Sequence, residues 1–184
     1  MERIMKPIED KYLLSSLDLV EGVFAKEYNP KEGKAVRQLV EEIRSKKYYV
    51  PELELIMVNE DDEVIGYAMF SRFHIEGRYE NDLLILTPVA VKTELQRQHI
   101  SKELLEYGFE KAKDLTFKAV LVEGNPKIYN PRGFQSSYKF GIEAGPNIKL
   151  PRPDCLMIKE LEKGALDKMS GLVDYSFYKS LHEG

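Results

Sequence analysis

Apolar residues recur every three or four positions in two stretches near the start of the chain. They are Leu13, Leu14, Leu17, Val20 and Phe24 in the first stretch, and Val36, Leu39, Val40 and Ile43 in the second. This spacing places apolar side chains on one face of a helix, and Asn29-Pro30 interrupts the pattern between the two stretches. The pattern predicts two amphipathic helices with a break at Asn29-Pro30.

Short runs of apolar residues come next, separated by charged residues. Leu53 to Asn59 and Val64 to Phe73 flank the charged tip Glu60 to Glu63. They predict the second and third strands of a meander, joined by a hairpin turn. The run Leu83 to Val91 is almost entirely apolar, which is typical of a central strand that is covered on both faces.

A helix and another strand are predicted after this central strand. The helix is marked by Leu104, Leu105, Gly108, Phe109 and Ala112. Ala119 to Val122 then reads as a strand, so that strand, helix and strand form one unit with a parallel pair. The carboxyl ends of that pair should face the segment between the first strand and the helix.

The last third of the chain predicts shorter elements. Late strands are expected at Tyr138 to Glu143 and at Cys155 to Glu160, with a loop from Ala144 to Pro153 that contains Pro and Gly. The tail from Leu172 to Tyr178 is too aromatic for a disordered end. We expect it to pack on the body of the protein.

Composition narrows the class of protein. The chain has 184 residues, 43% of them apolar, which suits a single domain over residues 1–184. A net charge of −4 with mixed signs and a mean hydropathy of −0.39 argue against nucleic acid and membrane as partners. Cys155 is the only cysteine, and Cys and His lack the spacing of metal ligands, so we expect a cytoplasmic protein without a metal.

Two motifs carry candidate chemistry. Gln96-Arg97-Gln98-His99-Ile100-Ser101 follows the central strand and leads into the helix, so backbone amides and a helix start can converge on an anion such as a diphosphate. Ile128 to Phe134 closes the unit with the sequence Ile-Tyr-Asn-Pro-Arg-Gly-Phe. At these residues the chain resembles the GCN5-related N-acetyltransferases, specifically a single-domain bacterial branch of predicted acetyltransferases.

The resemblance covers most of Leu53 to Tyr178 and implies both a fold and an activity. The implied fold is an α/β (α+β) acyl-CoA N-acyltransferase fold, in which a mixed, mostly antiparallel, twisted sheet of about 6–7 strands has helices on both faces. The implied activity is transfer of acetyl from acetyl-CoA to a primary amine by direct attack in a ternary complex.

The resemblance also implies the residues that hold acetyl-CoA. Its diphosphate would lie on the loop of Gln96, Arg97, Gln98, His99, Ile100 and Ser101, and its pantetheine arm on the strand edge of Val89, Ala90 and Val91. Asn125, in a run similar to the family's Gly-x-Pro loop, is assigned to the same cofactor.

The loop departs from the family pattern at two positions. The family commonly has Gly, one residue, then Gly or Ala, where this chain has His99 and Ser101. The imidazole either obstructs the diphosphate or donates a hydrogen bond to it. Without the resemblance, the same residues read as an ordinary solvated helix start with Ser101 near a cap.

The resemblance assigns Tyr129 as the general acid that protonates the departing thiolate, because Tyr129 lies four residues before Gly133. A tyrosine packed beside Phe134 is the structural alternative. Glu123 ends an apolar strand and is the first candidate for the base that accepts the amine proton. It could instead pair with Lys127 or Arg132, and Glu94 and His74 are the other candidate bases.

The sequence leaves two functions open, an N-acetyltransferase and a non-catalytic CoA-binding or ligand-sensing module on the same scaffold. The acceptor, a small-molecule or peptide amine, is not encoded in a legible motif. A homodimer is compatible with the sequence, which does not fix the oligomeric state.

Overall fold

The computed structural model describes residues 2–176 and 178 of the chain. A seven-stranded sheet has the order β1-β2-β3-β4-β5-β8-β6. Its strands are β1 Ile4–Pro7, β2 Glu54–Val58, β3 Val64–Arg72, β4 Leu83–Val91, β5 Ala119–Glu123, β6 Gln135–Ser136 and β8 Leu156–Glu160. Strands β4 and β5 pair in parallel, whereas the pairs β1–β2, β2–β3, β5–β8 and β6–β8 are antiparallel. The predicted mixed, mostly antiparallel sheet is therefore confirmed.

The chain forms two compact units. The first unit comprises Met1–Ser71, Thr87–Lys111 and Tyr178–Gly184, and the second comprises Arg72–Leu86 and Ala112–Phe177. A single acetyltransferase domain over residues 1–184 stays a prediction. In the described part of the chain, no helix is both long and apolar enough to cross a membrane.

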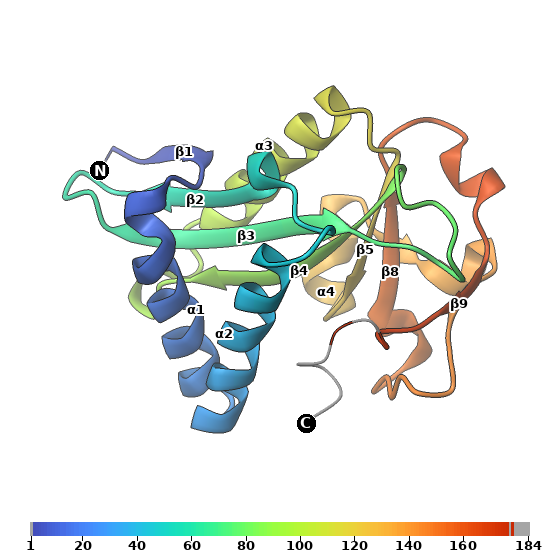
Figure 1. The fold of residues 1–184 in the computed structure, drawn as a ribbon, viewed down its shortest axis with the longest axis horizontal. Coiled ribbons are helices and arrows are strands. Elements are labelled where there is room, and N and C mark those ends of the chain that lie inside the picture. The colour runs from blue at the N-terminus through green and yellow to red at the C-terminus, as the bar shows by residue number, and fades with distance from the viewer. Residues whose placement is uncertain (1, 177, 179–184) are drawn as a thin grey trace. The chain divides into compact units, whose positions relative to one another are not determined.

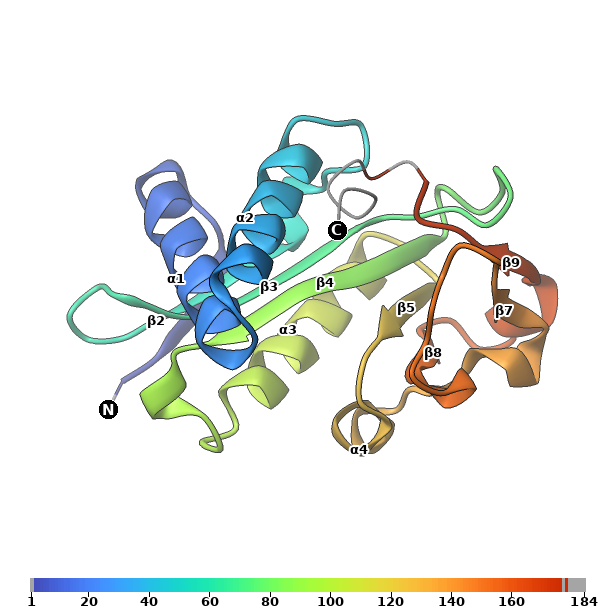
Figure 2. The same ribbon diagram turned by 90° about the horizontal axis from the view of Figure 1, so that it is seen from below.

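Helices cover both faces of the sheet in the first unit. Helices α1 (Leu13–Glu27) and α2 (Pro30–Arg44) lie on one face, and α3 (Ile100–Asp114) lies on the other (Figures 1 and 2). The rings of Phe70 from β3 and Phe109 from α3 meet edge to face, with centroids 5.9 Å apart and an interplanar angle of 76°. The predicted helices on both faces are confirmed.

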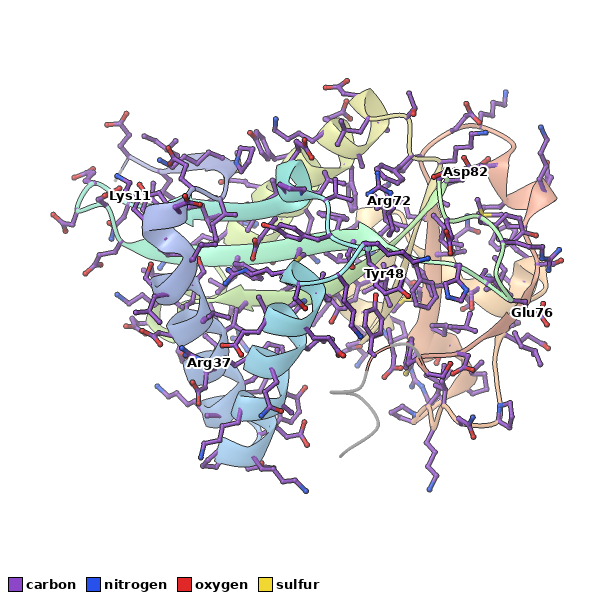
Figure 3. All side chains as sticks on the ribbon, viewed as in Figure 1. Lys11, Arg37, Tyr48, Arg72, Glu76 and Asp82 are labelled. Atoms are coloured by element: carbon purple, nitrogen blue, oxygen red, sulfur yellow. The ribbon has the colours of Figure 1, made fainter. Side chains whose placement is uncertain are left out.

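The break at Asn29-Pro30 is the start of α2. Asn29 Oδ1 accepts a hydrogen bond from Glu32 N at 2.9 Å, and Pro30 takes the first helical position, where no N–H is needed. Arg37 of α2 (Figure 3) reaches back to α1, where its Nη1 lies 2.7 Å from Asp18 Oδ1. The two predicted helices thus form an antiparallel pair tied by charge as well as by packing.

The side chain of Asn59 stabilises the charged turn between β2 and β3. Asn59 N donates to Glu63 O at 3.0 Å, and Asn59 Oδ1 accepts from Asp61 N and Glu63 N. Such local bonds favour a turn, so the hairpin forms without an Asn-Gly pair. Strand β1, which the sequence pattern did not locate, pairs with β2 and makes these the second and third strands, as predicted.

A buried carboxylate lies beneath α2. Glu54 is 0% exposed and accepts hydrogen bonds from Tyr49 Oη and Tyr67 Oη, both at 2.5 Å. Arg44 Nε and Nη2 lie 2.8 and 2.7 Å from Glu54 Oε2. Burial of the Tyr67 hydroxyl raises its pKa well above the usual range, and the nearby Glu54 carboxylate raises this pKa further. The Arg44 guanidinium therefore balances the charge of Glu54, and the two tyrosine hydroxyls donate hydrogen bonds to its oxygen atoms.

The second unit holds the end of the sheet. Strands β5 and β8 pair in antiparallel register from Ala119↔Glu160 to Glu123↔Leu156. Strands β7 (Ile142–Ala144) and β9 (Gly171–Val173) form a separate parallel pair. The predicted strand at Cys155 to Glu160 is confirmed as β8.

The predicted strand from Tyr138 to Glu143 is wrong. Ser137–Phe140 forms a 3₁₀ helix instead, and Gly141 follows in the left-handed region with φ 73°. A left-handed residue ends an extended run, because its backbone turns the chain away from the strand direction. Only Ile142–Ala144 remains extended, as β7.

The tail packs as predicted where the structure describes it. Val173 lies in β9 and is 0% exposed. Tyr178, in the first unit, is also 0% exposed, and its ring meets that of Tyr48 at 6.1 Å with an interplanar angle of 69°. Phe177, in the predicted tail, lies outside the described residues.

Candidate active site

The candidate phosphate loop is an exposed segment between two anchored residues of the first unit. Gln96, Arg97, Gln98 and His99 are exposed, whereas Ile100 is 1% exposed and packs with Met57 and Ile65. Leu95 is partly buried against the same cluster. Apolar packing on both sides therefore fixes where the loop begins and where α3 starts.

The backbone of this loop takes a path that favours glycine. Arg97 and His99 have φ values of 64° and 63°, in the left-handed region. His99 stands where the sequence motif has Gly, so the backbone conformation is present although the glycine is not. Helix α3 begins at Ile100, and the amides of a helix start are suited to an anion.

An arginine from the start of the chain holds the loop, and sequence reasoning missed it. Arg3 Nη2 donates to Gln98 Oε1 at 2.6 Å, and Arg3 Nη1 donates to Gln98 O at 3.3 Å. The two residues are 95 positions apart, and no local signal in the sequence links them. Arg3 therefore fixes the peptide group that precedes His99.

Strand β4 extends beyond the point where its parallel ladder with β5 stops. The ladder with β5 joins Leu83–Ile85 to Ala119–Leu121, and no further pair is recorded among the described residues. Strand β4 nevertheless continues to Val91. Val89 and Val91 are half-buried and Ala90 is buried. This stretch was predicted as the edge that receives the pantetheine amides.

Tyr129 lies in a short turn directly after β5 in the second unit. It ends the single-turn helix α4 (Pro126–Tyr129), and its ring lies so close to Gly124 that a Cβ there would overlap it. The ring meets Phe134 edge to face, with centroids 5.6 Å apart and an interplanar angle of 81°. The packed aromatic foreseen as the structural alternative is thus present, and packing fixes the ring.

Asn125 begins α4. Its Oδ1 accepts a hydrogen bond from Lys127 N at 3.0 Å, which caps the helix start. Its carboxamide oxygen therefore has a structural role, and its amide NH₂ is the group that can donate to a ligand.

Glu123 ends β5, one residue before the Gly124 that contacts Tyr129. Burial of its carboxyl group raises the pKa of Glu123, and a hydrogen bond from Tyr175 Oη to Oε1, at 3.1 Å, partly opposes this rise. Its hydrogen-bond partner among the described residues is Tyr175, not the Lys127 or Arg132 expected for a purely structural role. Tyr175 was not identified from the sequence.

The two other candidate bases lie elsewhere in the fold. His74 Nδ1 accepts a hydrogen bond from Gly77 N at 3.1 Å in the second unit. The Glu94 side chain is 67% exposed, with Oε1 4.0 Å from Lys92 Nζ in the first unit. Of the three carboxyl and imidazole candidates, Glu123 alone lies at the end of β5.

Each unit therefore gathers one part of the predicted set. The first unit joins the end of β4, a left-handed loop and a helix start. The second places Glu123 at the end of β5, and Asn125 and Tyr129 in the turn that follows. The residues described contain no group of three His, Cys, Asp or Glu side chains that could hold a metal ion. Such a sheet and loop define a class of proteins that use an acyl-CoA for acyl transfer.

The chain belongs to the acetyltransferase (GNAT) family, whose sequence profile matches residues 19–132. It is thus an acyltransferase of the N-acetyltransferase class, as predicted. Over 147 residues it is 24% identical to the uncharacterized N-acetyltransferase YhbS of Escherichia coli (strain K12), a match that covers 78% of this chain and 83% of the relative.

Solved structures support the same fold. The structure of YhbS from Escherichia coli in complex with CoA has a TM-score of 0.85 at 20% identity, covering 99% of this chain and 93% of the other. A GNAT family acetyltransferase from Brucella melitensis in complex with acetyl-CoA has a TM-score of 0.72 at 19% identity, covering 96% and 98%. At these identities the likeness establishes the fold.

Proposed function

We propose that this chain transfers the acetyl group of acetyl-CoA to a primary amine by direct attack in a ternary complex. The observation that carries the proposal is the early end of the β4–β5 ladder at Ile85↔Leu121, while β4 continues to Val91. A strand edge without a ladder partner on that side offers backbone groups to a ligand with amides. Two structural relatives contain CoA or acetyl-CoA, which supports this choice of ligand.

The first unit would hold most of the cofactor. Val89, Ala90 and Val91 would pair with the pantetheine amides. The loop from Gln96 to Ser101 would bind the diphosphate through backbone N–H groups and the start of α3, where the helix dipole favours negative charge. Asn125 would donate its amide NH₂ to the cofactor.

Glu123 at the end of β5 and Tyr129 in the turn after it would supply proton transfer. The neutral amine nitrogen attacks the thioester carbonyl carbon, so that a C–N bond forms and the C–S bond breaks. Glu123 accepts the proton that the nitrogen loses, and Tyr129 Oη donates a proton to the departing thiolate. The products are the acetylated amine and CoA, and the raised pKa of Glu123 suits a group that must accept a proton.

A non-catalytic CoA-binding or sensing module is the second candidate. His99 and Ser101 occupy the two positions where the family motif has small residues. An imidazole close to the diphosphate could hold the cofactor without turnover. This alternative predicts binding of acetyl-CoA with no release of CoA for any amine.

Thermal melting with acetyl-CoA tests binding. A ligand at 100 times its Kd adds about 2.7 kcal/mol to stability. For a chain of this size that is a rise in Tm of roughly 5–11 °C, since 1 kcal/mol corresponds to roughly 2–4 °C. No rise would contradict the proposed cofactor, and release of CoA thiol with a panel of amines then distinguishes the enzyme from the sensor.

Tyr129→Phe tests the general acid. The variant keeps the ring that packs on Gly124 and Phe134 and removes only the hydroxyl. We expect kcat to fall by about 10²–10⁴-fold while Kd for acetyl-CoA is unchanged. Tyr28→Phe, at a residue that is 63% exposed, is the matched control. Unchanged turnover in Tyr129→Phe would exclude the hydroxyl as the acid.

A further inference from the structure

The second unit contains a cavity that the chemistry above does not use. Its volume is about 820 Å³, within the usual range of roughly 300–1,000 Å³ for small-ligand sites. Apolar side chains form much of its lining: Ile142, Ala144, Ile148, Leu150, Pro153 and Leu156. Ile142 and Leu156 are 0% and 1% exposed, so the lining continues from the core of the unit.

The charged groups of the cavity leave one net negative charge. Arg152 pairs with Asp154 through two hydrogen bonds, Nε to Oδ1 at 3.0 Å and Nη2 to Oδ2 at 3.2 Å. Glu143 is exposed at the cavity, and no Lys, Arg or His among the described residues forms an ion pair with it. An apolar body with a cationic group complements this lining.

The cavity reaches the residue that lies opposite Glu123 in the sheet. Leu156 in its lining is the register partner of Glu123 across the β5–β8 ladder, and residues opposite each other on a ladder share one face of the sheet. A second connection leads the same way, because Ala144 in the lining pairs with Val173, two residues before the Tyr175 that donates to Glu123. Both connections stay within the second unit.

We propose that this cavity holds the acceptor, and that the acceptor is a small diamine whose hydrocarbon spacer lies on the apolar lining. This assignment rests on the proposed function. One amino group, neutral, is acetylated beside Glu123, with bond changes and proton transfers as given above. The other, protonated, binds the Glu143 carboxylate. A peptide amine is the competing acceptor, and the test below includes it.

Steady-state release of CoA thiol from the full chain tests the acceptor. The probes are diaminoalkanes and 1-aminoalkanes of equal chain length, at saturating acetyl-CoA. We expect kcat/KM to be about tenfold higher for the diamine, as for a hydrogen bond to a charged group. Glu143→Gln should lower kcat/KM for the diamine about tenfold, through KM, and so reduce its preference over the monoamine. Glu160→Gln, at an exposed carboxylate at the far end of β8, is the control.

Equal kcat/KM for diamine and monoamine, or a preference that survives in Glu143→Gln, would overturn the assignment, as would a peptide amine that exceeds every diamine. Binding of the diamine without cofactor, measured by calorimetry, separates the two proposals. If acetyl-CoA gives no rise in Tm but the diamine binds and Glu143→Gln weakens it about tenfold, the cavity assignment stands and the transferase proposal fails. If amines are turned over but the rate does not depend on Glu143, the transferase proposal stands and the cavity assignment fails.

Discussion

Because His99 has a left-handed backbone, we predict that His99→Gly changes both the stability of the chain and its affinity for the cofactor. His99 has φ 63° and is exposed, so His99→Gly removes little buried surface. A non-glycine residue in the left-handed region costs roughly 1–2 kcal/mol, and glycine adds back roughly 0.5–1 kcal/mol through the entropy of the unfolded chain. The difference spans about 0–1.5 kcal/mol, and we expect a net gain of up to about 1 kcal/mol, since histidine tolerates this region better than most residues.

The assay is thermal melting without ligand. For a chain of this size, a gain of up to about 1 kcal/mol corresponds to a rise in Tm of up to roughly 4 °C. Arg97→Gly is the matched control, because Arg97 is exposed in the same loop with φ 64° and should give a similar rise. A fall in Tm for His99→Gly would refute the reasoning, because it would mean that the imidazole stabilises the loop by more than the strain costs.

The same variant bears on the cofactor. The imidazole stands where the family motif has no side chain, and a ligand that immobilises it loses about 0.5–1.5 kcal/mol. Since the backbone already follows the path of glycine, we expect His99→Gly to bind acetyl-CoA about threefold more tightly, measured by calorimetry. Weaker binding would show that the imidazole donates to the diphosphate, and the obstruction argument would then be wrong.

Two further predictions concern groups that the sequence pattern did not find. Glu54→Gln should destabilise the chain by about 3 kcal/mol in chemical unfolding, because it leaves the half-buried Arg44 guanidinium without its anion. Replacing both Glu54 and Arg44 with Met should recover much of this loss. A larger loss in the double variant would contradict the explanation. Tyr175→Phe removes the hydrogen bond that lowers the pKa of Glu123, so this pKa should rise and the acid limb of kcat/KM should move to higher pH, because the base acts when deprotonated. If the acid limb does not move, then either Glu123 is not the base or Tyr175 does not act on its pKa.

The elements with strong local signals could be predicted from the sequence. The run Leu83 to Val91 reads as a central strand because it must be apolar on both faces, and β4 has these bounds. The helix after it was marked by apolar spacing, and α3 begins at Ile100, inside the predicted loop. The predicted strand from Tyr138 to Glu143 was wrong because its apolar and aromatic residues resemble a strand, whereas the observed 3₁₀ turn ends at the left-handed Gly141.

The parts of the site that the sequence did not reveal depend on contacts over long distances in the chain. Arg3 reaches Gln98 across 95 positions, and Tyr175 reaches Glu123 across 52. Each pair needs the sheet to be assembled before the two groups meet, and neither residue stands in a motif. The sequence could therefore indicate Glu123 as a base from its place at the end of an apolar strand, but not the hydroxyl that acts on its pKa.

The candidate phosphate loop explains how a motif can lose its glycine and keep its backbone. Glycine in such a loop permits a left-handed residue at low cost, but the chain path also depends on what lies at either end. Here Leu95 and Ile100 pack against the cluster of Met57 and Ile65, and Arg3 holds the Gln98 peptide group. These contacts offset the cost of a left-handed His99, because strain of this size persists where the surroundings fix the conformation. It follows that the substitution alters what the loop presents to an anion more than the position of its backbone amides.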